Sequence, residues 1–134
     1  MNVQRSTMNA QRSSEEARFD LEKRLLDYAV RVIGVTEKMN PTEAGHYVSD
    51  QLLRSGLSPD GNHGEAEGAE SRKDFIHKLG ICYKELRDSR RWLKLVHRAK
   101  LVPQPKLLDD LIGEADELVR IFAKSLQTAK KNQD

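Results

Sequence analysis

Two stripes of side chains run along residues 73–98, and their spacing limits what this segment can fold into. Each stripe advances by alternating steps of four and three residues, which keeps its members on one face of an α-helix. One stripe contains no carboxylate: Lys73, His77, Gly80, Lys84, Arg87, Arg91, Lys94 and Arg98. The other is mostly apolar: Phe75, Leu79, Cys82, Leu86, Ser89, Leu93 and Val96. The stripes lie about 145° apart around a helix, so we expect one buried side and one cationic side.

The six fully charged members of the first stripe are called the cationic ridge below. Their segment is basic although the chain is nearly neutral: residues 69–100 hold ten Lys/Arg against four Asp/Glu, while the whole chain has a net charge of +2. Charge is therefore concentrated on one part of the protein, as expected of a surface that meets a polyanion. A solvated helix face, stabilised by pairs such as Asp88 with Arg91, is the alternative interpretation.

Length and composition favour a single helical domain that acts inside the cell. A chain of 134 residues can bury one core, and 5% aromatic with 33% charged residues is typical of helical proteins. Cys82 is the only cysteine and lies on the apolar stripe, so we expect a buried thiol and no disulfide. The N-terminus lacks an apolar signal region, and no apolar run is long enough to span a membrane. We therefore expect a cytoplasmic protein.

Helix signals divide the chain into an arm, a bundle and a tail. We expect a disordered N-terminal arm over residues 1–15, a four-helix bundle over 16–129 and a frayed tail over 130–134. The first helix should span about 16–39 and end before Pro41, with Thr42 capping a second helix from Glu43. Gly56 and Pro59 predict a break in that second helix. Third and fourth helices should span about 70–100 and 106–129. Short connections favour an all-α, antiparallel up-down four-helix bundle.

The apolar stripe of the fourth helix is wider than one helix contact needs. Its main seam is Leu108, Leu111, Ala115, Leu118 and Phe122, and further apolar residues flank it. We therefore expect this helix, or the first one, to contact another subunit as well.

Polar and apolar residues in a fixed order span residues 51–93. They are Gln51-Leu52-x-Arg54-Ser55-x-x-Ser58-Pro59-x-x-Asn62-x-x-Glu65-Ala66, then Glu70-Ser71-x-x-Asp74-Phe75-Ile76-x-Lys78-Leu79, then Lys84-Glu85-x-Arg87-x-x-x-x-Trp92-Leu93. This motif resembles the bacterial four helix bundle protein family, which includes proteins encoded by intervening sequences within 23S ribosomal RNA genes. The accessory variability determinant of diversity-generating retroelements is a structural relative. The resemblance covers roughly residues 19–127.

The resemblance implies a four-helix bundle that assembles as a homopentameric barrel with a positively charged surface for RNA or DNA. In the retroelement branch it also implies a reverse-transcriptase partner. It further implies that the second helix continues through Pro59 to about Gly68, against the local signals. This chain departs from the family pattern at Gly61 and Gly64, where apolar or helix-favouring residues are usual. The polar motif residues Arg54, Asn62 and Glu65 should join a hydrogen-bonded network between helices or subunits.

Catalytic and metal chemistry find little support in the sequence. Glu43 and His46 match the Glu-x-x-His pattern of di-iron bundles. The near match, Asp74 with His77, fails because His77 lies on the cationic side. No phosphate-binding loop or nucleophile–base pair can be argued. We therefore expect neither an enzyme, nor a metal site, nor a cofactor.

The leading hypothesis is a non-catalytic, homo-oligomeric adaptor that binds nucleic acid with little sequence specificity. Six ridge residues would contact phosphates, with Lys78 and Arg90 as weaker candidates: Lys73, Lys84, Arg87, Arg91, Lys94 and Arg98. The aromatic residues Tyr28, Tyr83 and Trp92 could stack on bases, but packing between helices is the favoured interpretation. The alternative function is a protein-interaction scaffold whose ridge docks an acidic partner protein.

Overall fold

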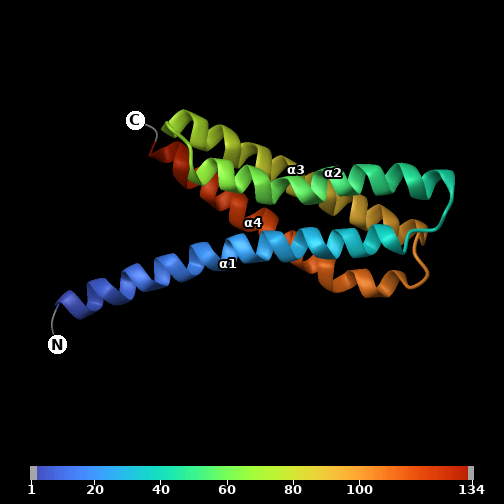
Figure 1. Cartoon of the computed structure of the whole chain (residues 1–134), viewed down its shortest axis with the longest axis horizontal. Helices are drawn as coiled ribbons and strands as arrows, with labels where there is room; N and C mark the ends of the chain where they lie inside the picture. Colours follow the sequence, from blue (N-terminus) through green and yellow to red (C-terminus); the bar gives the residue numbers. More distant parts are fainter. Residues whose placement is uncertain (1–2, 133–134) are drawn as a thin grey trace.

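The computed structural model describes the backbone of residues 3–132 and the side chains of residues 20–132. Within this range the chain forms four α-helices, one short 3-10 helix and no strand. The α-helices are α1 (Val3–Glu37), α2 (Glu43–Glu67), α3 (Arg72–Ala99) and α4 (Asp109–Lys131), and the 3-10 helix η1 (Pro105–Leu108) precedes α4. Figure 1 shows them running alternately up and down, which confirms the expected four-helix bundle.

Each helix packs against the next one along the chain, and α1 also contacts α4, which closes the bundle. Arg24 fastens this last seam, because its guanidinium meets both carboxylate oxygens of Glu114, at 3.0 and 2.6 Å. At one end of the bundle, the connection between α1 and α2 is bound to the connection that follows α3. The backbone amide of Asn40 donates to the backbone carbonyl of Leu101 at 2.8 Å. No helix among the described residues is long and apolar enough to cross a membrane.

The first helix begins at Val3, so the expected start near residue 16 is wrong. Residues 3–15 contain neither proline nor glycine, and seven of these thirteen residues are the good helix formers Gln, Arg, Met, Ala or Glu, so nothing stops the helix from extending toward the N-terminus. Figure 1 shows that this first part of α1 projects beyond the other helices. The expected tail is also shorter, because α4 continues to Lys131. Met1, Asn2, Gln133 and Asp134 lie outside the described residues.

The second helix runs without interruption from Glu43 to Glu67, so the break predicted at Gly56 or Pro59 is wrong and the continuation implied by the family resemblance is confirmed. Thr42 caps its start, as expected, by accepting the Gly45 amide at 3.0 Å. Pro59 is fully buried, so its ring contributes apolar packing in place of the hydrogen bond that it removes. Gly56 does not form a turn. It allows α1 and α2 to approach each other closely.

Gly56 lies against Val32 of α1, and a Cβ placed on it would come within 2.8 and 2.9 Å of the two Val32 methyl carbons. The β-branched side chain of Val32 cannot turn both of its methyl groups away from an added Cβ. Gly56→Ala is therefore expected to lower the free energy of unfolding by about 1–2 kcal/mol. Gly61→Ala in the same helix should instead stabilise by up to about 1 kcal/mol, since nothing lies within 4 Å of its added Cβ. Urea unfolding of both variants tests the contact.

A double-mutant cycle isolates the contact between these two helices. In a Val32→Ala background, Gly56→Ala should become neutral or stabilising, because the clashing methyl groups are gone. An equal loss in both backgrounds would show that Gly56 is needed for another reason.

The third helix places its apolar stripe in the core. Leu79, Cys82, Leu86, Leu93 and Val96 are buried there, as expected, and Phe75 packs at the edge of the core. Ser71 caps the start of the helix by accepting the Asp74 amide at 3.1 Å. At its other end Lys100 adopts the left-handed conformation (φ 55°), in which its amide reaches carbonyls of the last turn.

One polar stripe member, Ser89, takes part in a buried hydrogen-bond chain. Its hydroxyl donates to the Leu86 carbonyl at 2.9 Å and lies 2.7 Å from the Tyr28 hydroxyl. Because the Ser89 proton is used on Leu86, Tyr28 must be the donor to Ser89. Tyr28 is therefore a core residue between helices, as the favoured interpretation expected.

The buried Tyr28 hydroxyl and Cys82 thiol should make the free energy of unfolding fall at alkaline pH. Burial raises the pKa of Tyr28 from 10.0 to about 12 and that of Cys82 from 9.0 to about 12. The unfolded chain therefore loses these protons first, and the free energy of unfolding should fall as pH rises from about 9 to 12, by at most about 1.4 kcal/mol per pH unit for each group. Urea unfolding across this pH range should show that the free energy of unfolding declines less steeply with pH in Cys82→Ala than in the wild-type protein. An unchanged slope in that variant would contradict the assignment.

Candidate nucleic-acid interface

All six members of the cationic ridge are exposed on the outer face of α3. They extend from its first turn at Lys73 to its last turn at Arg98, over about 37 Å of helix axis. The expected placement of the two stripes is thus confirmed: one faces the core and the other faces solvent. A surface of this length could meet several successive phosphates of a nucleic acid.

One ridge member is partly neutralised. The Lys84 ammonium lies 3.3 Å from Asp88 and 3.7 Å from Glu85, and the hydrogen bond to Asp88 is the main reason why the pKa of Lys84 is raised. The solvated-face interpretation supposed that Asp88 pairs with Arg91, but Asp88 pairs with Lys84 instead. Such an exposed pair is weak, but it makes Lys84 the least available of the six cations.

The other five ridge cations have no ion pair among the residues that the structure describes: Lys73, Arg87, Arg91, Lys94 and Arg98. Arg87 is held differently, since its guanidinium carbon lies 5.4 Å from the centre of the Tyr83 ring. This contact orients the side chain but leaves its charge uncompensated. The ridge therefore keeps most of its charge available to an anionic partner.

Lys78 and Arg90, the weaker candidates, instead connect helices. Lys78 lies 2.7 Å from Glu65 of α2, and Arg90 lies 3.2 Å from Asp116 of α4. Both are only partly exposed, so their charges are committed to the bundle. A structural role explains them better than phosphate contact.

The polar residues of the family-like motif form no single network. Glu65 does bridge helices through Lys78, in the way we expected. Asn62, however, donates within its own helix to the Ser58 carbonyl at 3.0 Å, and Arg54 is exposed without an ion pair among the described residues. Only Glu65 therefore behaves as predicted within one subunit.

The residues considered for metal binding lie apart from the core. Glu43 and His46 are both exposed in the first turn of α2, and His77 is exposed on α3. In the part of the chain with described side chains, no group of three or more His, Cys, Asp or Glu could hold a metal ion. Cys82 is buried with a raised pKa, which makes its thiol a poor nucleophile.

One exposed aromatic residue, Tyr47, was not among the residues expected to contact nucleic acid. Tyr47 of α2 is 60% exposed, and its ring centre lies 6.1 Å from that of Trp92 on α3. The buried positions of α2 include Gly45, Val48 and Leu52, at steps of three and four. Tyr47 falls outside this pattern, which is the signal that could have placed it on the surface.

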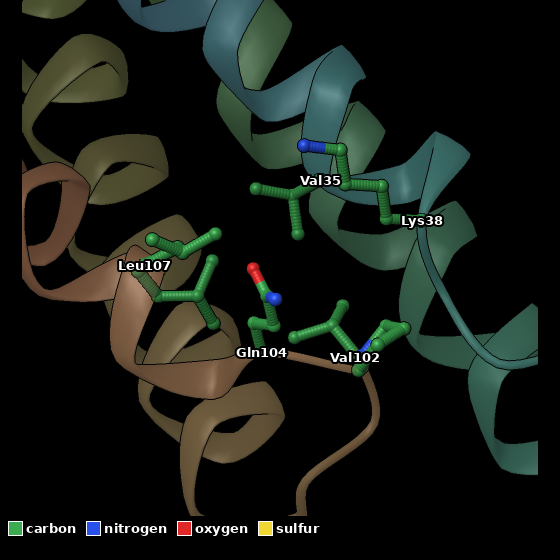
Figure 2. Close-up of a pocket in the computed structure, with 7 residues that line it drawn as sticks. Val35, Lys38, Val102, Gln104 and Leu107 are labelled. Atoms are coloured by element: carbon green, nitrogen blue, oxygen red, sulfur yellow. The ribbon is translucent and has the colours of Figure 1, made fainter.

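A separate pocket of about 210 Å³ opens where α1 ends beside the α3–α4 connection. Figure 2 shows the Gln104 amide directed into it between Val35 and Leu107, with the Lys38 side chain above. Its lining is otherwise apolar and includes none of the ridge cations. Nothing in its chemistry connects it to the ridge.

Fold and surface together define a small helical-bundle protein with a cationic outer face on one helix. The chain belongs to the family described as 23S rRNA-intervening sequence proteins, whose pattern matches residues 9–124. This confirms the resemblance drawn from residues 51–93.

A solved structure shares this fold. It is a protein of unknown function from the S23 ribosomal protein family of Bacteroides thetaiotaomicron, with a TM-score of 0.73 and 28% sequence identity. The similarity covers 82% of this chain and 97% of the other. No curated protein matches the chain.

Proposed function

We propose that this protein is a non-catalytic nucleic-acid adaptor that contacts RNA or DNA phosphates through the cationic ridge. The observation that carries the proposal is the row of five exposed cations that have no ion pair among the described residues. Contacts of this kind give affinity with little sequence choice, because phosphates are the same at every position. The family's association with 23S ribosomal RNA genes gives independent, if general, support for RNA.

The proposal includes assembly into a homo-oligomer, with five subunits by the family resemblance. Supporting it, three residues of α1 form an exposed apolar stripe, namely Leu26 (53%), Val30 (60%) and Ile33 (38%). They are spaced by four and three residues and so share one helix face. In a ring the ridge would repeat in every subunit, and weak phosphate contacts would add by multivalency. A reverse transcriptase or another ribonucleoprotein is the proposed partner.

Fluorescence anisotropy at low salt tests the proposal. Labelled structured RNA, duplex DNA and single-stranded DNA should all bind the purified protein, with similar affinities for unrelated sequences. An acidic polypeptide such as polyglutamate should compete only weakly with duplex DNA and structured RNA, because an extended polypeptide carries about one charge per 3.4 Å whereas a duplex carries about one per 1.7 Å. The alternative, docking of an acidic protein partner, predicts the reverse order of competition. Absence of binding to every nucleic acid would overturn the proposal.

A further inference from the structure

A surface groove lies beside the ridge between α2 and α3. Gln51 contributes from α2, and Asp88, Arg91, Trp92 and Leu95 contribute from α3. Tyr47 lies one turn before Gln51 and contacts Trp92, which places its ring at the edge of this groove. The groove thus combines aromatic and aliphatic side chains with one cation of the ridge.

The aromatic pair is arranged to leave one ring accessible. The Tyr47 and Trp92 rings meet at 72°, an edge-to-face contact that fixes Tyr47 without covering it. Tyr47 is 60% exposed and Leu95 is 44% exposed, whereas Trp92 is half-buried. A rigid, exposed ring of this kind offers a flat apolar surface at little cost in side-chain entropy.

Charge around the groove favours an anionic ligand. Arg91 belongs to both the ridge and the groove, and it has no ion pair among the described residues. The carboxylate in the groove, Asp88, is already engaged by Lys84 at 3.3 Å. A ligand that carries both a negative charge and a flat ring would use Arg91 and Tyr47 together.

We propose that this groove binds an unpaired nucleobase of single-stranded RNA or DNA. The base stacks on Tyr47 while Arg91 contacts the adjoining phosphate. A nucleic acid that follows the ridge must therefore be single-stranded at this point to fill the groove. Bases within a duplex are already stacked and cannot enter. This inference rests on the proposed function, since it assumes that the ridge binds phosphates, and it adds a preference for single strands.

The chain carries its own reporter for this site, because Trp92 is its only tryptophan. Titration of the full chain with a single-stranded oligonucleotide should quench or shift Trp92 fluorescence. An oligonucleotide of the same length with abasic sites, or a duplex of the same sequence, should bind without this change. Ribose and deoxyribose versions of the single strand distinguish RNA from DNA.

Tyr47→Leu is the matching variant, and its exposed position means that the fold should be unaffected. We expect it to weaken single-strand binding about tenfold, the contribution of one stacked base, and to leave duplex binding within about twofold. Tyr47→Phe should retain single-strand affinity, because it keeps the ring. Circular dichroism and sedimentation of both variants serve as controls.

The possible outcomes separate the two proposals. Equal binding of single strands and duplex, with unchanged Trp92 fluorescence, would overturn the stacking site and leave the ridge function standing. No binding of any nucleic acid would overturn both. A change of oligomeric state in Tyr47→Leu would show that the groove is an interface between copies, and would also overturn the stacking site.

Discussion

Replacing Arg87 and Arg91 together by Glu is expected to reduce affinity for structured RNA and duplex DNA by at least about 100-fold at low salt. Both side chains are exposed, and neither has an ion pair among the described residues. The change replaces two phosphate contacts by two repulsive charges, and in a homo-oligomer it does so in every subunit. The salt slope of binding should also become shallower by about 2 for each subunit that contacts the nucleic acid, since each such subunit no longer releases about two counterions.

A matched control exists on α4. Arg120 and Lys124 are exposed, have the same four-residue spacing, and give the same change in net charge when both are replaced by Glu. This control should bind within about threefold of wild type, because the ridge is intact. Equal losses in the two double variants would show that net charge and not the ridge drives binding. Undiminished binding by the ridge variant, with helicity and assembly intact, would show that the site is wrong.

Truncation of Leu86 to Ala should produce the largest loss of stability, about 2–5 kcal/mol in the free energy of unfolding. Leu86 is fully buried on the apolar stripe of α3, and its carbonyl also accepts the Ser89 hydroxyl of the buried hydrogen-bond chain. Removing its side chain leaves a cavity among rigid helices, which can collapse only in part. Urea unfolding at a fixed subunit concentration measures the effect, because assembly would make stability depend on concentration.

The same substitution at Leu95 provides the comparison. Leu95 lies on the same helix but is 44% exposed, so Leu95→Ala should cost no more than about 0.5 kcal/mol. The contrast tests the division of α3 into a buried and an exposed side. Similar losses at both positions would mean that Leu95 is covered in the native assembly.

The parts of the fold that could be predicted are those with a regular repeat. The stripes of α3 extend over seven turns, and a repeat of that length determines which residues face the core. The apolar seam expected of the fourth helix was predictable for the same reason: Leu111, Ala115, Leu118 and Phe122 of α4 are buried, and so is Leu108, which lies in η1. Thr42 was predictable because a cap depends only on its neighbours in the chain.

Single residues that serve tertiary contacts were misread from local rules. Gly56 predicted a break because glycine weakens helices, but its purpose is to admit Val32 from another helix. Pro59 is tolerated because it is buried in the core. Only a fold-level argument, which the family resemblance supplied, predicted that α2 would continue.

The candidate site was predictable in its charges and not in their pairing. The spacing placed six cations on one face, but Lys84 finds Asp88 through side-chain geometry that a charge count cannot show. Lys78 and Arg90 likewise find partners on other helices. Tyr47 was overlooked because an apolar residue in a helix is assigned to the core by default, although its phase around α2 differs from that of the buried set.

The most direct test of the central claim is the salt dependence of binding to duplex DNA, measured by fluorescence anisotropy of the wild-type protein. If the ridge contacts phosphates, the logarithm of the association constant should fall linearly with the logarithm of salt concentration, with a slope of about −3 for three contacts and a steeper one when more subunits engage. Binding should remain measurable near physiological salt. A slope shallower than about −1, or no binding at low salt, would contradict the account.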